Sequence, residues 1–173
     1  MKALIGDEPE QKTLEVDFEY VAPSEAYYHI VRQLLLQYLD GPQQEKLDIS
    51  AMADHILERA SIGSVIASSL GYEDPEKNPE YESLPDKEFD KIVLKANAKR
   101  DVYGFITILS LTKYKEKFEW MRSIYDYTLQ KAEKYLSSRV KEFTHILHTL
   151  NIGLLVNERL VNMPADVVPD LHS

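Results

Sequence analysis

The stretch that decides the fold is GLLVNERLVNMPADVVP, residues Gly153 to Pro169. From Ile152 to Val156 the residues are apolar or glycine, a run that predicts a strand covered on both faces of a sheet. Asn157, Glu158 and Arg159 then interrupt the run, so the second half of the strand has to satisfy an amide and an ion pair.

A helix is expected directly after this strand. Asn162 is suited to the N-cap position, and Pro164 fits the first turn, where a missing N–H leaves no hydrogen bond unmade. Asp166 is an early acid of the kind that the helix dipole favours. The chain is therefore predicted to turn from strand to helix at Asn162.

Three segments, in this order along the chain, resemble the BCCIP family, a family of eukaryotic nuclear proteins. They are SIGSVI at residues 61–66, VYGFITILSLT at residues 102–112, and the junction itself, which follows the run (L/V)-(S/N)-E-R-(L/F)-(V/I)-N-(M/V/I)-P. The resemblance covers residue 14 to the C-terminus. Residues 71–99 match nothing in it.

The resemblance implies an acetyltransferase-like α/β fold, a mixed sheet flanked by helices. Family members continue well beyond the end of this chain, so we expect a C-terminally truncated form of that fold. The expected domain organisation is a single incomplete domain over 14–173, a disordered tail over 1–13, and a partly disordered insertion loop over 71–100.

The hydrophobic pattern predicts the element order strand, helix, helix, strand, strand, helix, strand, helix start. The two early strands are expected at Leu14 to Val21 and at Ile62 to Ala67, where Gly63 marks a bulge or a close backbone approach. The first helix is capped by Ser24, ends at Gly41-Pro42 and buries a stripe made of Tyr27, Ile30, Val31, Leu34, Leu35 and Tyr38. The second starts at Asp48 or Ser50 and turns Met52, Ile56, Leu57 and Ala60 inward.

The second half of the chain is dominated by one strong strand and a long helical pattern. Residues 86–96 predict a short helix around Phe89, Ile92 and Val93, and residues 102–111 predict a strand. Residues 118–150 predict one long helix, or two with a break near Ser137-Ser138. The apolar positions of that pattern are Phe118, Met121, Tyr125, Ala132, Leu136, Val140, Phe143, Leu147 and Leu150.

Composition narrows the class of protein. The 173 residues suit one domain, and no run reaches the ~20 apolar residues that span a bilayer. The first residues lack the apolar core of a signal peptide, so a soluble intracellular protein without membrane insertion is expected. The chain has no cysteine, which excludes disulfides, thiolate nucleophiles and cysteine-ligated metal sites.

Charge is divided unevenly along the chain. Residues 1–90 carry 7 basic and 20 acidic side chains, whereas residues 91–173 carry 13 and 9, within a total net charge of -9. An acidic surface disfavours phosphate backbones and attracts basic partners. Acids that only keep the surface soluble explain the same numbers.

The fold implied by the resemblance raises the alternative of an acyltransferase that uses acetyl-coenzyme A. Such enzymes hold the pyrophosphate on the backbone N–H groups of a glycine-rich turn. The corresponding turn here, Thr112 to Lys117, has no glycine, so bulky side chains obstruct the backbone approach. We therefore expect no enzyme and no cofactor.

Other candidate sites have simpler structural explanations. His145 and His148 lie one helical turn apart and could bind a metal, but no third ligand is near and a role at a helix C-terminus is favoured. Glu158 and Arg159 are neighbours on a strand, so they point to opposite faces and form no catalytic dyad. We assign no catalytic, cofactor-binding or metal-binding residue, and leave partner-binding residues undetermined.

A nucleic-acid surface would come from the second half of the chain. It would use the cations Lys113, Lys115, Lys117, Arg122, Lys131, Lys134, Arg139 and Lys141, interleaved with the aromatic residues Tyr114, Trp120, Tyr125, Tyr127 and Tyr135. A solvated amphipathic helix explains the same pattern. Because the chain is acidic overall, tight binding of nucleic acid is not expected.

The BCCIP resemblance implies a non-enzymatic nuclear adaptor or chaperone. It implies escort of a basic protein of the large ribosomal subunit, a role in ribosome biogenesis and nuclear export, and shuttling to the cytoplasm. It further implies links to a cell-cycle inhibitor and a recombination mediator that acts in DNA repair. The acidic first half supplies a physical reason for the ribosomal partner, because shielding a basic surface requires negative charge.

Overall fold

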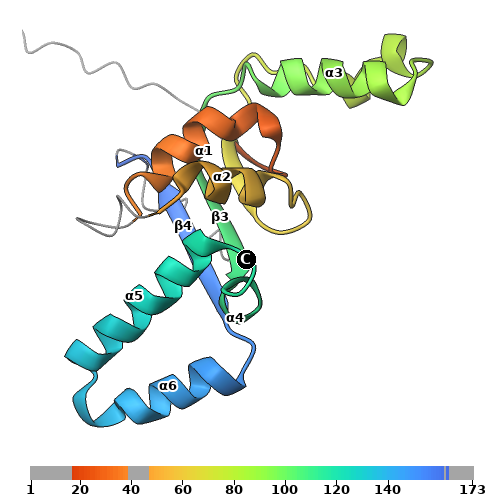
Figure 1. The fold of residues 1–173 in the computed structure, drawn as a ribbon. Helices are drawn as coiled ribbons and strands as arrows, with labels where there is room; N and C mark the ends of the chain where they lie inside the picture. The colour runs from red at the N-terminus through yellow and green to blue at the C-terminus, as the bar shows by residue number, and fades with distance from the viewer. Residues whose placement is uncertain (1–16, 39–46, 162, 164–173) are drawn as a thin grey trace, which may run out of the picture.

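The computed structural model describes residues 17–38, 47–161 and 163 of the chain. They form a four-stranded sheet with helices around it (Figure 1). The strands β1 (Phe18–Val21), β2 (Ser64–Ser68), β3 (Val102–Ser110) and β4 (Gly153–Arg159) lie in the order β1-β2-β3-β4, and every neighbouring pair is antiparallel. The predicted α/β class is confirmed.

The connection from β3 to β4 sets the direction of the last strand. It consists of α4 (Leu111–Tyr114), α5 (Glu119–Tyr135), η5 (Ser137–Arg139) and α6 (Val140–Thr149). Because the helical pattern breaks near Ser137-Ser138, α5 leads away from the sheet and α6 leads back (Figure 1). The chain returns to the same end of the sheet, so β4 runs antiparallel to β3.

This topology differs from the mixed sheet that we expected. A single helix between the two strands would carry the chain across the sheet and make a parallel pair. Two helices make no such crossing, and the described strands contain no parallel pair. The acetyltransferase-like fold is therefore not confirmed.

Two of the predicted helix caps are present. The Ser24 hydroxyl accepts a hydrogen bond from the Ala26 N–H and starts η1 (Glu25–Tyr27), which leads into α1 (Tyr28–Leu35). The Asp48 carboxylate accepts from the Ala51 N–H at 3.0 Å and starts α2 (Ile49–Leu57). Since α2 ends at Leu57, Ala60 is exposed and the prediction that it points inward is wrong.

Several other predictions concern residues outside the described ranges. They are the beginning of the strand predicted from Leu14, the Gly41-Pro42 stop, the Asn162 cap with its helix, and the tail over 1–13. Within the described part, Leu136 and Leu150 follow α5 and α6 and are 39% and 56% exposed, so they do not extend the apolar stripe.

The main core lies on one face of the sheet. Side chains from β2, β3 and β4 meet α1, α2 and α5 there, and each fully buried Val, Leu or Ile stabilises the fold by about 1.5 to 3 kcal/mol. The central members are Val31, Leu34, Leu35, Met52, Ile56, Val65, Phe105, Leu109, Met121 and Val156.

The other face of the sheet is only partly covered. Ile66, Ile106 and Met163 form a small buried cluster there. Further along, the paired residues Ile108 and Leu155 are 54% and 46% exposed. The prediction that residues 152–156 are covered on both faces is therefore wrong for the described part of the chain, where β4 is an edge strand.

Gly63 permits a close contact between backbone segments just before β2. Its φ of +101° lies in the left-handed region, and a Cβ there would overlap the carbonyl oxygen of Ile106. Next to it, the Thr107 hydroxyl donates to the carbonyl of Ile62 at 3.2 Å. The predicted close backbone approach at Gly63 is confirmed.

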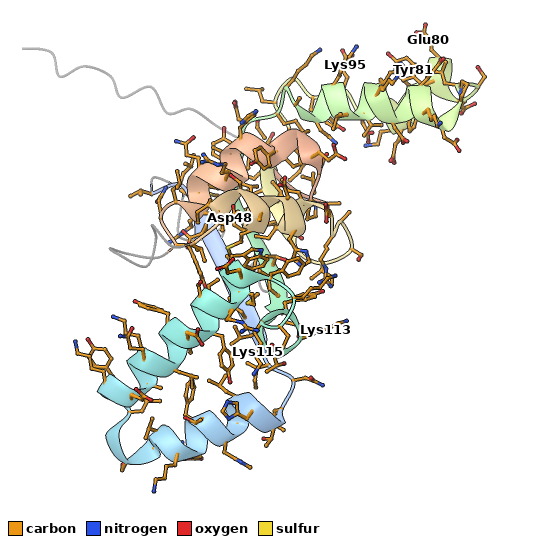
Figure 2. All side chains as sticks on the ribbon, viewed as in Figure 1. Asp48, Glu80, Tyr81, Lys95, Lys113 and Lys115 are labelled. Carbon is orange, nitrogen blue, oxygen red and sulfur yellow. The ribbon has the colours of Figure 1, made fainter. Side chains whose placement is uncertain are left out.

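Residues 71–100, which we call the arm, project from the rest of the molecule (Figure 1). The arm contains η3 (Pro75–Lys77), η4 (Pro79–Tyr81) and α3 (Asp86–Asn97), so the helix predicted over 86–96 is confirmed. No residue of α3 is fully buried. Figure 2 shows Glu80 and Tyr81 at the outer end of the arm and Lys95 nearer the body.

Candidate functional site

An acidic groove lies between the arm and the body of the protein. It has a volume of about 750 Å³ and is lined by residues of β1, η1, the end of α2, η3 and α3. We call it the arm groove. Its charged lining consists of Glu19, Glu25, Glu58, Asp74, Glu76 and Asp90 against Lys91 and Arg100.

Arg100 fixes the arm to the sheet. Its side chain is 3% exposed, and its Nη2 donates to the Glu19 carboxylate at 2.7 Å. Its Nε donates to the carbonyl of Ser68 at 2.9 Å, and its guanidinium lies 4.0 Å from the centroid of the Tyr72 ring. The Tyr72 hydroxyl in turn donates to Asn97 of α3 at 3.2 Å. One cation therefore joins β1, β2 and the arm.

Most of the carboxylates of the groove are not neutralised. Glu19 pairs with Arg100, and Asp74 pairs with Lys77 at 3.2 Å. Four other acids, Glu25, Glu58, Glu76 and Asp90, form no ion pair within the described part of the chain. They come from both walls, two from the body and two from the arm. The groove therefore presents negative charge from two sides.

The Tyr27 hydroxyl lacks a hydrogen-bond partner in this region. Tyr27 lines the groove, is 2% exposed, and its Oη forms no hydrogen bond with the described residues. Burial raises the pKa of Tyr27, and the charges of Tyr72 and Glu19 raise it further, while the positive charge of Arg100 lowers it. A buried polar group left without a partner costs about 1 to 3 kcal/mol.

A cluster of rings around His55 holds α2 against α4 and α5. The imidazole lies 4.8 Å from the Tyr114 ring, 4.6 Å from Phe118 and 5.8 Å from Trp120, measured between centroids. Arg59 donates a hydrogen bond to the Tyr114 hydroxyl. Burial lowers the pKa of His55, and Arg59 and Lys117 add to that effect while Glu58 opposes it.

The segment at the position of the coenzyme A turn of acetyltransferases already uses its backbone N–H groups in local hydrogen bonds. The Lys113 N–H donates to the Ser110 hydroxyl, and the Lys115 N–H donates to the Leu111 carbonyl. The Lys117 N–H donates to the Tyr114 carbonyl, and the Tyr114 side chain is buried. These three N–H groups are therefore not available to hold a pyrophosphate.

The histidine pair lies near the end of α6. His145 and His148 are both exposed, and His148 stands in the last turn. No group of three metal-ligating side chains occurs among the residues that the structure describes.

Glu158 and Arg159 lie on opposite faces of β4, as predicted. Glu158 pairs across the sheet with Phe105, whereas Arg159 pairs with Gly104. Neither forms the predicted ion pair within the described ranges, and the Arg159 Nη1 is buried without a hydrogen-bond partner there. Burial raises the pKa of Glu158. Burial, and after it the charge of Glu158, raises the pKa of nearby Tyr38 to about 12.

The aromatic residues of the candidate nucleic-acid surface are mostly inside the protein. Tyr114, Trp120 and Tyr125 are at most 8% exposed and belong to the main core. Tyr127 and Tyr135 lie further out on α5, where the Lys131 ammonium is 4.9 Å and 5.8 Å from their ring centroids. Lys113 and Lys115 lie at the base of the α5–α6 hairpin (Figure 2). Stacking on bases requires exposed rings, and three of the five are not exposed.

The arm groove was not predicted from the sequence. Its acids are scattered between residues 19 and 90, so no local motif marks it; the acidic excess of the first 90 residues is the one signal that pointed toward it. Tyr27 was correctly predicted to lie on the buried stripe. The apolar spacing of the helix predicts that the Tyr27 ring is buried, but it does not indicate what the Tyr27 hydroxyl binds.

None of the described helices is long and apolar enough to cross a membrane.

Comparison with solved structures supports the fold. The crystal structure of BCP1 from Saccharomyces cerevisiae matches with a TM-score of 0.54 and 24% sequence identity. The match covers 96% of this chain and 60% of that chain. At this level of identity the likeness concerns the fold alone.

Comparison with known sequences identifies the family. Protein bcp1 of Emericella nidulans is 28% identical over 161 residues, which are 92% of this chain and 46% of that protein. Protein bcp1 of Schizosaccharomyces pombe is 29% identical over 160 residues, 92% of this chain and 48% of that protein. The chain thus spans about half the length of the curated relatives it matches. Since the BCCIP family model matches residues 13–173, the chain belongs to the BCCIP family.

Proposed function

We propose that this chain acts as a non-enzymatic nuclear adaptor or chaperone of the BCCIP type. It binds a basic protein of the large ribosomal subunit, shields the basic surface and escorts the partner during ribosome biogenesis and nuclear export. On this proposal the protein works in the nucleus and shuttles to the cytoplasm. A cell-cycle inhibitor and a recombination mediator are proposed as further partners.

The observation that carries the proposal is the arm groove, with its six carboxylates and two cations. A ribosomal protein that binds RNA exposes clustered Lys and Arg side chains when the RNA is absent. Carboxylates that face one another across a groove attract such a surface and exclude phosphate backbones by repulsion.

The test is co-expression with the basic large-subunit ribosomal protein, followed by size-exclusion chromatography at low and high salt. We expect a one-to-one complex at about 0.1 M salt that dissociates as the salt concentration rises, because screening weakens exposed charge pairs. A basic protein unrelated to ribosomes, such as egg-white lysozyme, is the control for non-specific attraction. Absence of a complex with the ribosomal protein, or equal binding of both proteins, would contradict the proposal.

A second measurement separates this proposal from an acyltransferase. A ligand that binds only the native protein raises its melting temperature. We expect no change with saturating acetyl-coenzyme A, because the N–H groups of Lys113, Lys115 and Lys117 already have partners. A clear rise would favour an enzyme.

A further inference from the structure

We propose that the arm groove takes up an arginine-containing segment of the basic partner. This inference rests on the proposed function and adds to it a binding site and the chemistry of the group that is bound. Three features of the groove support it: negative charge on both walls, an unpartnered hydroxyl and a guanidinium that is already present.

The first observation is that the negative charge comes from both walls. Glu25 and Glu58 belong to the body, Glu76 and Asp90 belong to the arm, and none of the four has an ion-pair partner in the described part of the chain. A guanidinium presents five donors in a planar fork and can join two carboxylates at once. The volume of about 750 Å³ lies within the usual range of ligand sites, roughly 300 to 1,000 Å³.

The second observation is the hydroxyl of Tyr27. Tyr27 is 2% exposed, lines the same groove and leaves its Oη without a partner among the described residues. If the acids of the groove served only to keep the protein soluble, they would not explain why the buried Tyr27 Oη beside them lacks a hydrogen-bond partner. In the free protein this oxygen is closed off from solvent. A bound segment whose guanidinium N–H comes within reach of it satisfies the hydroxyl in the complex.

The third observation is the environment of Arg100. Its guanidinium contacts a carboxylate, a backbone carbonyl and the Tyr72 ring within the lining of the groove. The groove thus already accommodates one group of the proposed kind. A lysine ammonium lacks the planar face and the fork, so arginine is expected to bind more tightly than lysine.

The test measures binding of a short fluorescein-labelled peptide of alternating arginine and glycine by fluorescence anisotropy, with the matching lysine peptide as comparison. The groove variant is Glu58→Gln, Glu76→Gln and Asp90→Asn. The control variant is Glu80→Gln, Glu82→Gln and Glu88→Gln, which removes three exposed acids of the arm that do not line the groove. Figure 2 shows Glu80 at the outer end of the arm.

Both variants lose three negative charges, so attraction at long range falls equally. We expect the groove variant to weaken binding of the arginine peptide roughly tenfold and the control variant by less than about threefold. Tyr27→Phe should weaken binding by about threefold while the melting temperature stays the same or rises, since the hydroxyl has no partner to lose in the free protein.

Equal losses in the two triple variants would overturn the groove as the site. If the chain still bound the ribosomal protein in a salt-dependent way, the proposed function would stand and the partner would bind elsewhere. Binding of neither the peptide nor the ribosomal protein would overturn both proposals. Equal affinity for the arginine and lysine peptides would overturn the preference for a guanidinium.

Discussion

Replacing Arg100 with methionine should destabilise the protein and release the arm. The side chain is 3% exposed and joins the arm to two strands through a carboxylate, a carbonyl and an aromatic ring. Methionine keeps most of the length of the apolar stem, so the variant removes the guanidinium with little change in packing.

The size of the effect follows from the three contacts. The hydrogen bond from a charged donor to the carbonyl of Ser68, a buried residue, stabilises by about 1.5 to 3 kcal/mol. Stacking on Tyr72 contributes about 0.5 to 1 kcal/mol. Glu19 is half exposed, so its ion pair contributes less than about 1 kcal/mol. We expect a loss of about 2 to 4 kcal/mol in the free energy of unfolding.

Two probes measure this loss. Trp120, the sole tryptophan, is buried in the main core and reports urea unfolding of the body by fluorescence. Hydrogen exchange of α3 amides reports the arm. Lys99→Met is the matched control, because Lys99 is an exposed neighbour with the same charge. A loss below about 0.5 kcal/mol by both probes would refute the role of Arg100 as the anchor of the arm.

Three further predictions test other parts of the fold. His55→Leu should flatten the fall in melting temperature between about pH 7.5 and 5.5. Because the pKa of His55 is lowered in the folded protein, the stability contributed by its neutral imidazole is complete above the ordinary pKa near 6.5 and is lost as the pH falls. An unchanged slope of melting temperature against pH would contradict this. Glu158→Gln should raise the melting temperature at neutral pH, because burial raises the pKa of Glu158 and folding then disfavours its charge; the gain should vanish in thermal melts below about pH 4.5, where the carboxyl is protonated in both states. Gly63→Ala should lower the free energy of unfolding in urea by about 2 kcal/mol or more, since the new Cβ overlaps the Ile106 carbonyl oxygen and the backbone is strained at φ +101°. Gly71→Ala, at φ +70° with open space around it, should lower it by only about 1 kcal/mol. Equal losses in the two variants would show that the overlap at Gly63 is unimportant.

Local signals in the sequence predicted the elements well. Ser24 and Asp48 mark two helix starts because their side-chain oxygens accept backbone N–H groups within three residues. Gly63 is another local signal, since the conformation and the contact that require glycine occur at the residue itself. Such features depend on neighbours in the chain and can therefore be predicted without the fold.

The direction of β4 could not be predicted in the same way. It depends on whether the chain between β3 and β4 forms one helix or two, and Ser137-Ser138 is a weak break that fits both. The exposure of Ile108 and Leu155 is likewise a property of the whole sheet, because an apolar strand pattern does not show which element covers it. Both features depend on long-range arrangement.

The arm groove depends even more on long-range arrangement. Its lining combines residues that are as far apart in sequence as Glu19 and Arg100, and the charge pattern shows only that acids are abundant. The helical period of α3 was visible around Phe89, Ile92 and Val93. The surface that α3 faces could not be predicted, because no residue of α3 is buried and the sequence therefore does not indicate which element packs against it.

The Arg100→Met variant also distinguishes between two explanations of how the groove binds a basic segment. If negative charge alone decides affinity, Arg100→Met should tighten binding of the arginine peptide, because it removes a cation from the lining. If both walls must stand at a fixed separation, the same variant should weaken binding, because the arm loses its contacts with Glu19 and Ser68. We expect weaker binding at about 0.1 M salt, where charges beyond about 10 Å are largely screened and contacts within the groove dominate. Tighter binding by the variant would show that the acids act as a diffuse negative surface.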